Sequence, residues 1–169
     1  MGTAAARAET YTVLERAFGD IASMNWGEDQ SNIAEIARVF SPLPRQLERA
    51  ARGDASYAEI LNDLRKRAAN TKSFDWVTRV VENQQQRNPG DVVVHLHRLL
   101  YDALLEIRMA GYESNNHEAY RLADVVHNVP LQLLMVLHGR RSYEEVVEDV
   151  RQRATRRRLE AWVDSVLDD

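Results

Sequence analysis

The chain reads PRQLERAARGDASYAEILNDLRKRA over residues 44–68 and PLQLLMVLHGRRSYEEVVEDVRQRA over residues 130–154, two versions of one pattern. At an offset of 86 positions, residues 32–82 align with residues 118–168 without a gap. Sixteen of the 51 aligned pairs are identical, whereas chance would give roughly three at ordinary amino-acid frequencies. A repeat of this length predicts a protein built from two tandem copies of one unit.

The local signals inside each copy are helical. Apolar residues recur three and four positions apart, which places them on one face of a helix. Pro44 suits the first turn of a helix, and Gly53 suits the position just after the helix end. Ser56 and Glu59 then have the spacing of a capping box at the start of the next helix. The second copy repeats these signals at Pro130, Gly139, Ser142 and Glu145.

Each copy holds about five such helices, and no segment shows a competing strand pattern. We therefore expect an all-α fold, in which the two units pack as a pseudo-symmetric bundle. The expected units are residues 8–87 and residues 92–169, both within one compact domain.

Three further expectations concern the chain ends and the core. Residues 88–91, Asn-Pro-Gly-Asp, have turn chemistry and separate the units. The alanine-rich residues 1–7 are expected to form a flexible tail. Trp76 and Trp162 align with each other, and a large aromatic residue at the same place in both copies predicts that both are largely buried.

Composition excludes several classes of protein. Apolar residues make up 44% and charged residues 28% of the chain, which is typical of a soluble globular protein. No apolar run approaches the roughly 18 residues of a membrane span. The chain has no cysteine, which excludes disulfides and thiolate metal ligands. With no export signal and a net charge of −4, we expect a cytoplasmic protein that does not bind nucleic acid non-specifically.

No arrangement of side chains points to catalysis, so we expect no catalytic residue, no metal site and no cofactor. The histidines all lie in the second copy, and none has the spacing of a metal-binding motif. Asp63 lies four residues before Arg67, and Asp149 lies four residues before Arg153. This spacing predicts ion pairs along a helix rather than general acid–base chemistry.

Arginines cluster between residues 151 and 158. Acidic side chains stand near them at helical pairing distances, so solvated ion pairs on a helix surface are the expected arrangement. The alternative is a nucleic-acid-associated regulator that uses the Arg151–Arg158 cluster, although such a surface needs interleaved aromatic side chains. The acidic neighbours are Glu144, Glu145, Glu148 and Asp149.

The most distinctive local sequence is LADVVHNVP at residues 122–130. Its pattern L-A-D-x-x-H-N-x-P resembles a signature of small, mostly uncharacterised, all-helical bacterial proteins. The resemblance implies an all-helical fold and no particular activity. The residue before a proline avoids helical geometry, so the stretch is also expected to turn between two helices. Asn128 is suited to cap the second of these helices, and His127 to bond a nearby carbonyl group.

The helix after this turn differs most between the copies. Residues 131–137 read LQLLMVL, where residues 45–51 of the first copy read RQLERAA. A helix that is apolar nearly all round must be covered on several sides or present a binding surface. We expect it to lie at the seam between the units, with the charged helix of residues 45–52 at the surface. An interface with a partner or a second copy is the alternative, and the candidate interface residues are Leu131, Leu134, Met135, Val136, His127 and Asn128.

These features favour a non-enzymatic helical protein that binds another protein. An acidic, cysteine-free chain of this size suits an immunity- or antitoxin-type inhibitor, whose acidic surface would steer it to a basic toxin domain. Two alternatives stay open. One is the nucleic-acid-associated regulator, and the other is a structural protein that forms homodimers or larger homo-oligomers.

Overall fold

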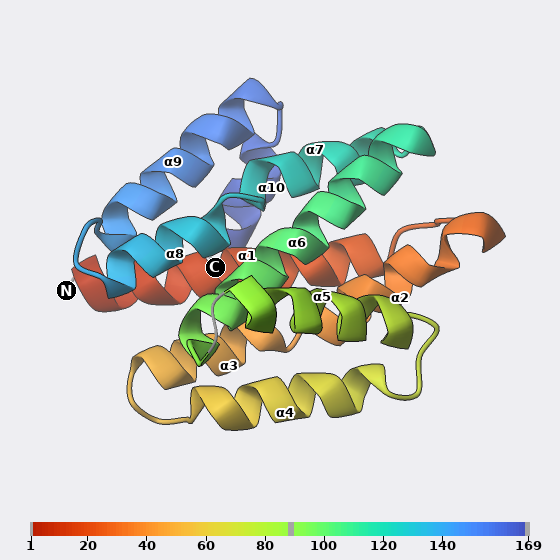
Figure 1. Cartoon of the computed structure of the whole chain (residues 1–169). Coiled ribbons are helices and arrows are strands. Elements are labelled where there is room, and N and C mark those ends of the chain that lie inside the picture. The colour runs from red at the N-terminus through yellow and green to blue at the C-terminus, as the bar shows by residue number, and fades with distance from the viewer. Residues whose placement is uncertain (1, 88–89, 168–169) are drawn as a thin grey trace.

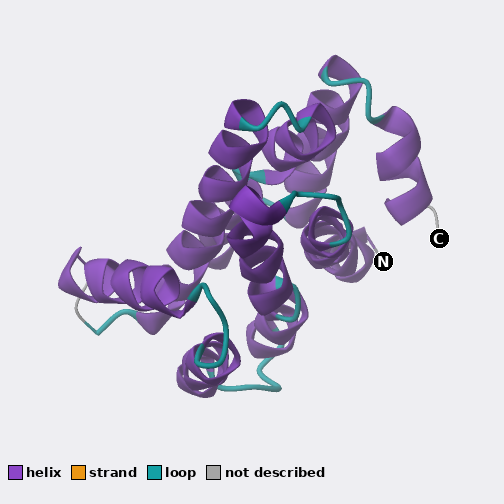
Figure 2. Cartoon of the chain, turned by 90° about the vertical axis from the view of Figure 1, so that its right-hand side faces the viewer, coloured by secondary structure: helices purple, strands orange, loops and turns teal. Residues whose placement is uncertain are grey.

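A computed structural model of the chain describes residues 2–87 and 90–167. These residues form an all-helical protein without a β-strand, as expected (Figures 1 and 2), and none of their helices is long and apolar enough to cross a membrane. The first half comprises α1 (Gly2–Ala22), the 3-10 helix η1 (Glu28–Gln30), α2 (Ser31–Phe40), α3 (Leu43–Ala51), α4 (Tyr57–Ala68) and α5 (Phe74–Arg87). The second half comprises α6 (Val92–Glu113), α7 (His117–Val126), α8 (Val129–Leu137), α9 (Tyr143–Arg156) and α10 (Glu160–Leu167).

The helix bounds in the two halves correspond. α2 and α7 begin and end at positions that differ by the repeat offset, and so do α3 and α8. Pro44 and Pro130 each stand in the first turn of their helix, where the missing amide hydrogen has no partner to lose. Gly53 and Gly139 follow with φ angles of 85° and 73°, left-handed values that glycine adopts without strain.

The helices that follow these glycines begin differently. Ser142 forms the expected capping box, in which its hydroxyl accepts from the Glu145 amide at 3.1 Å and the Glu145 carboxylate accepts from the Ser142 amide at 3.2 Å. Ser56 makes no side-chain capping bond, so the predicted box of Ser56 and Glu59 is wrong. Ser56 keeps the extended backbone of a cap residue, and α4 therefore begins at the same register without the hydroxyl bond.

The expected flexible tail at residues 1–7 needs correction. Residues 2–7 belong to α1, and Ala6 is buried. Alanine has the highest helix propensity of any residue, which explains why this segment extends the helix. Of the expected turn at residues 88–91, the first two lie outside the described residues. Asp91 caps α6 by accepting from the Val94 amide at 3.1 Å.

Two long helices, α1 and α6, hold the halves together (Figure 1). Besides α2 and α3, α1 packs against α7, α9 and α10 of the second half. Besides α7 and α8, α6 packs against α2, α4 and α5 of the first half. Leu14 on α1 and Leu100 on α6 are fully buried, and the buried apolar side chains form one continuous core. Each long helix therefore completes the core of the other half.

The expected position of α8 is wrong. α8 packs mainly against α6 and α9, both in the second half, whereas α1 and α6 form the seam between the halves. The charged α3 is anchored in the same way against α1 and α4, and it exposes Arg45 and Arg49. An apolar composition indicates that a helix needs cover on several sides, but it does not identify which helix supplies the cover.

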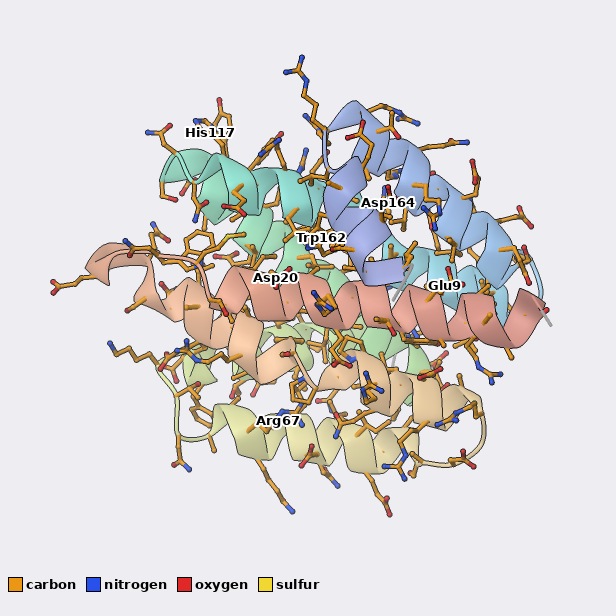
Figure 3. The ribbon with its side chains drawn as sticks, turned by 180° about the vertical axis from the view of Figure 1, so that it is seen from behind. Glu9, Asp20, Arg67, His117, Trp162 and Asp164 are labelled. Atoms are coloured by element: carbon orange, nitrogen blue, oxygen red, sulfur yellow. The ribbon has the colours of Figure 1, made fainter. Side chains whose placement is uncertain are left out.

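Trp76 and Trp162 are only partly buried, so the expectation that both are largely buried is wrong. Trp76 packs edge-on against Phe40, with ring centroids 6.2 Å apart. The Trp162 indole nitrogen donates to the Asp20 carboxylate at 2.7 Å and so joins α10 to α1 (Figure 3). A side chain with a large apolar ring and one polar donor suits this boundary between core and solvent.

Candidate functional site

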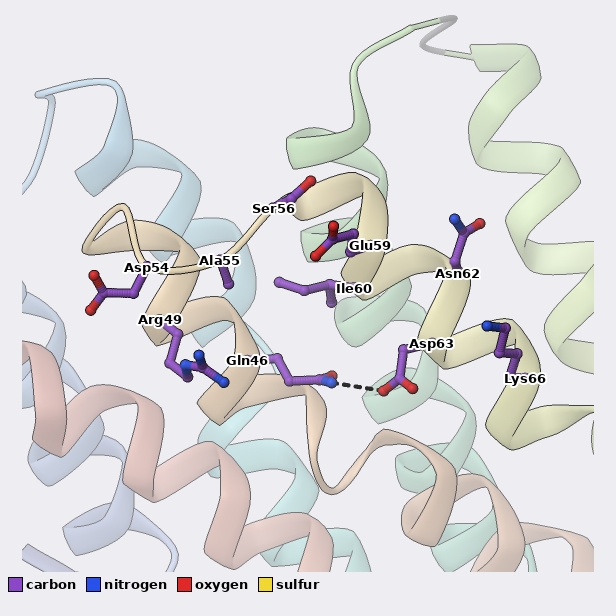
Figure 4. Close-up of a pocket in the computed structure, with 10 residues that line it drawn as sticks. All are labelled: Gln46, Arg49, Asp54, Ala55, Ser56, Glu59, Ile60, Asn62, Asp63 and Lys66. Carbon is purple, nitrogen blue, oxygen red and sulfur yellow. Dashed lines mark hydrogen bonds between the residues drawn. The ribbon is translucent and has the colours of Figure 1, made fainter.

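A hollow of about 430 Å³ lies between α3 and α4 in the first half (Figure 4). Across it, the Gln46 amide donates to the Asp63 carboxylate at 2.7 Å, and Arg67 forms an ion pair with the same carboxylate. The hollow thus has side chains of both charges along its walls. The charged residues that line it are Arg49, Asp54, Glu59, Asp63 and Lys66.

The second half has a hollow of about 360 Å³ at the corresponding place along α9. The same bonds recur beside it: the Gln132 amide donates to Asp149 at 2.8 Å, and Arg153 forms an ion pair with Asp149 at 2.8 Å. The two predicted ion pairs at four-residue spacing are therefore confirmed. The residues that line this hollow are Arg141, Glu144, Glu145, Glu148, Asp149 and Gln152.

The carboxylate of Asp149 is ionised and bonds residues of both α8 and α9. Burial acts to raise its pKa, but the hydrogen bond from Gln132 and the ion pair with Arg153 outweigh burial and lower the pKa below its ordinary value. A carboxyl group that serves as a general acid near neutral pH needs a raised pKa instead. The chemistry of this carboxylate therefore favours a role in joining α8 to α9.

The two hollows differ in the residues around them. The first half has Arg45 and Arg49 on α3, where the second half has Leu131 and Met135 on α8. Met135 is 41% exposed, and Leu131 is partly exposed. On the neighbouring helix, Glu144 and Glu148 replace an alanine and an asparagine of the first half. The second half therefore presents apolar side chains beside an acidic groove, a surface that we call the α8–α9 face and define as Leu131, Met135, Glu144, Glu145 and Glu148.

The predicted interface residues of α8 do not share one environment. Leu134 is buried, Val136 is partly exposed, and Met135 is the most exposed of the set. Packing against α6 and α9 covers Leu134 and leaves Met135 exposed and Leu131 and Val136 partly exposed. Only Leu131, Met135 and Val136 are therefore placed to contact a partner without a rearrangement.

His127 and Asn128 lie in the turn between α7 and α8. The His127 ring nitrogen Nδ1 lies 2.9 Å from the Asp124 carbonyl oxygen, which confirms that this side chain bonds a nearby carbonyl. Asn128 precedes α8 but makes no capping bond, so its predicted capping role is wrong. With its side-chain amide oriented to suit its neighbours, Asn128 accepts from Arg153 at 2.9 Å. Both residues therefore hold the turn.

The other histidines give no metal site. Within residues 2–87 and 90–167, no group of three or more histidine and carboxylate side chains is arranged to hold a metal ion. His95 and His97 are buried in α6. Burial lowers the pKa of His97 to about 4, so this ring is neutral at physiological pH, and its Nδ1 lies 2.7 Å from the Val93 carbonyl oxygen.

The arginine cluster forms one of its expected ion pairs, between Arg153 and Asp149 at 2.8 Å, and also pairs with residues of other helices. Arg151 lies 3.1 Å from Asp164 on α10, and Arg157 lies 2.6 Å from Asp124 on α7. Aromatic rings also stand among the arginines, because Tyr120 of α7 lies beneath the Arg157 guanidinium at 5.7 Å. Sequence spacing could not reveal this contact, since Tyr120 and Arg157 are on different helices.

Comparison with known proteins gives no relative to guide the interpretation. Neither the known protein-family models, nor the curated proteins, nor the solved structures include a match to this chain.

Proposed function

We propose that this chain is a non-enzymatic helical protein that binds another protein through the α8–α9 face. One observation carries the proposal: Met135 and Leu131 stand partly open to solvent where the first half has arginines. At the aligned positions of α3, Arg45 lies 2.8 Å from Glu15 and Arg49 is exposed, which supports the view that packing does not require apolar residues here. Methionine and other apolar side chains are enriched at the centres of protein interfaces.

The chemistry of the face indicates the kind of partner. Glu144, Glu145 and Glu148 are exposed along α9, beside the apolar residues of α8. An apolar centre with an acidic border suits a partner that presents apolar residues surrounded by lysine or arginine. We propose a basic protein domain as the partner, and an immunity- or antitoxin-type inhibitor of a bacterial toxin as the biological role.

We also propose that the two halves are diverged copies related by pseudo-two-fold symmetry. The packing of the long helices supports this symmetry. α1 contacts α7, α9 and α10 of the second half, and α6 contacts the corresponding helices α2, α4 and α5 of the first half. The bond between Gln46 and Asp63 likewise has its counterpart between Gln132 and Asp149. Superposition of residues 32–82 on residues 118–168 in an experimental structure tests the proposal, and a different helix order or crossing geometry contradicts it.

The test of partner binding uses residues that the chain itself supplies. The double variant Leu131→Arg and Met135→Arg gives the second half the residues of the first half, so it should fold normally. Wild-type protein is immobilised, its partner is identified from the source cell, and the complex is rebuilt from purified components. The double variant should weaken this complex at least about thirtyfold, because two central contacts of roughly 1 kcal/mol or more each are lost.

A matched control comes from the first half. Arg45→Gln and Arg49→Gln change the equivalent positions of α3, and the complex should keep its affinity. Equal weakening by both double variants would refute the α8–α9 face as the binding surface. Self-association that is lost in the Leu131→Arg and Met135→Arg variant, with no other partner, would favour the alternative of a homo-oligomeric structural protein.

A further inference from the structure

A second hollow in the second half has the opposite charge. Its volume is about 350 Å³, and it is lined by Asp124 from α7 and by Arg153, Arg156 and Arg157 from the end of α9. Three arginines face one aspartate, which leaves an excess of two positive charges. The ion-pair partners just outside the lining, Asp149 and Arg108, add one charge of each sign and leave the excess unchanged.

Most of these arginines are held in place before any ligand binds. Asp124 is only 13% exposed, and its two oxygens lie 2.8 Å from Arg108 and 2.6 Å from Arg157. Arg121 donates to the Arg157 carbonyl at 3.1 Å and fixes the backbone there. Arg156 is exposed and has no hydrogen-bond or ion-pair partner within the described part of the chain. Its guanidinium group is therefore available to a ligand.

The arginines are not needed to cap the C-terminus of α9. Cationic side chains often stabilise a helix C-terminus through its free carbonyl groups. Here the Ala154 carbonyl accepts from the Leu159 amide at 2.8 Å, and the Thr155 carbonyl accepts from the Arg158 amide at 3.2 Å. Because backbone donors satisfy these groups, capping does not account for Arg156.

An aromatic hollow adjoins the arginines. It has a volume of about 230 Å³ and is lined by Arg108, Met109, Tyr112, Glu113 and Tyr120. The Glu113 carboxylate lowers the positive excess of the two hollows and their ion-pair partners together to one charge. Arg108 and Arg157 both lie over the Tyr120 ring, at 5.4 Å and 5.7 Å from its centroid. Arg157 lines the charged hollow and Tyr120 the aromatic one, so their contact places the two hollows next to each other. The Tyr112 ring lies 5.9 Å from the Tyr120 ring and is 71% exposed.

The first half shows that the fold does not require this site. Its residues at the positions of Asp124, Arg156 and Arg157 are arginine, asparagine and threonine. At the position of Tyr120, the ring beneath Arg108 and Arg157, it has Ala34. The ion pairs of Asp124 join α7 to α6 and α9, so helix packing explains Asp124, but it does not explain the exposed Arg156 and Tyr112.

We propose that these adjoining hollows bind a nucleoside monophosphate or a similar small phosphate monoester with a planar ring. A phosphate monoester carries a charge of roughly −1.5 to −2 at pH 7, and the three arginines that face one aspartate in the larger hollow attract it. Guanidinium groups bind phosphate oxygens through paired N–H donors. The exposed Tyr112 ring offers a face on which a base can stack. This ligand site is independent of the protein partner proposed for the α8–α9 face.

Calorimetric titration with AMP, inorganic phosphate and adenosine tests the site. AMP should bind more tightly than inorganic phosphate, and adenosine should bind most weakly, because the charged contacts supply most of the affinity. Arg156→Gln should weaken AMP binding at least about tenfold through loss of a charge-assisted contact. Tyr112→Ala should reduce the affinity for AMP to that for inorganic phosphate and leave phosphate binding unchanged.

Arg140→Gln is the matched control, because Arg140 is an exposed arginine in the turn before α9 and should not contribute. Circular dichroism of each variant establishes that it is folded. No binding of AMP or phosphate by the wild-type chain, or equal binding by Arg156→Gln and Arg140→Gln, would overturn the proposal. Tighter binding of a single-stranded oligonucleotide without a terminal phosphate would overturn it in favour of a nucleic-acid surface. The Leu131→Arg and Met135→Arg variant should bind AMP normally, so failure of either proposal can be recognised separately.

Discussion

The hydrogen bond between Trp162 and Asp20 provides a test of how the two halves interlock. It joins α10 to α1 across 142 residues of sequence, and its 2.7 Å length is that of a charge-assisted bond. Such bonds contribute roughly 1.5–3 kcal/mol, and the partial exposure of both side chains places this one at the lower end. We expect Asp20→Ala to lower the free energy of unfolding by about 1.5 kcal/mol. Trp162→Phe, which also removes part of the indole surface, should lower it by about 2 kcal/mol.

A double-mutant cycle separates the bond from the loss of each side chain. Urea unfolding at pH 7 is measured for the wild type, the two single variants and the double variant. The coupling energy between Asp20 and Trp162 should be about 1 kcal/mol.

Trp76 supplies the control, because it is the equivalent tryptophan of the first half and packs on Phe40. Trp76→Phe and Asp20→Ala should be additive within about 0.3 kcal/mol. A coupling between Asp20 and Trp162 that is no larger than this control would refute the role of the bond in holding α10 against α1.

Three further predictions follow from the packing and the backbone. Residues 1–88 and residues 89–169, expressed separately, should each be largely unfolded because α1 and α6 complete each other's halves; mixing should restore the helical circular dichroism signal, and a stably folded monomeric fragment would contradict the interlocked core. Arg158 has a φ angle of 60°, so Arg158→Gly should raise the free energy of unfolding by roughly 0.5–1 kcal/mol, and a loss of stability in thermal melts would count against a strained backbone there. Burial lowers the pKa of His97 to about 4, below the value of about 6.5 in an unfolded chain. As the pH falls below 6.5, His97 takes up a proton in the unfolded chain before it does so in the folded protein, which favours unfolding. The free energy of unfolding should therefore decrease by about 3 kcal/mol between pH 6.5 and pH 4. His97→Gln should lose less over the same range in urea titrations, and parallel losses would show that His97 is not the titrating group.

Local sequence signals predicted the helices well. Pro44 and Pro130 stand in the first turns of α3 and α8, and glycines end both helices, because backbone preferences act within a few residues. Side-chain capping was less predictable. Ser142 forms its capping box whereas Ser56 does not, since a serine at the right spacing can also turn its hydroxyl to solvent.

Contacts between helices could not be predicted from spacing. The apolar residues of α8 suggested a position at the seam, but α1 and α6 take that position and leave Met135 exposed. Spacing along α9 predicts the ion pair of Arg153 with Asp149, which forms, but it does not predict that Arg157 pairs with Asp124 of α7 and lies over Tyr120. These contacts depend on how the helices fold against one another, which the period of a single helix does not specify.

The most direct test of the central claim is the affinity of the purified protein partner for the Leu131→Arg and Met135→Arg variant. This variant keeps the backbone and gives α8 the arginines that α3 already carries at the equivalent positions. We expect unchanged thermal stability and a complex at least about thirtyfold weaker than that of the wild type. Wild-type affinity in a folded variant would contradict the claim that this protein acts through its α8–α9 face.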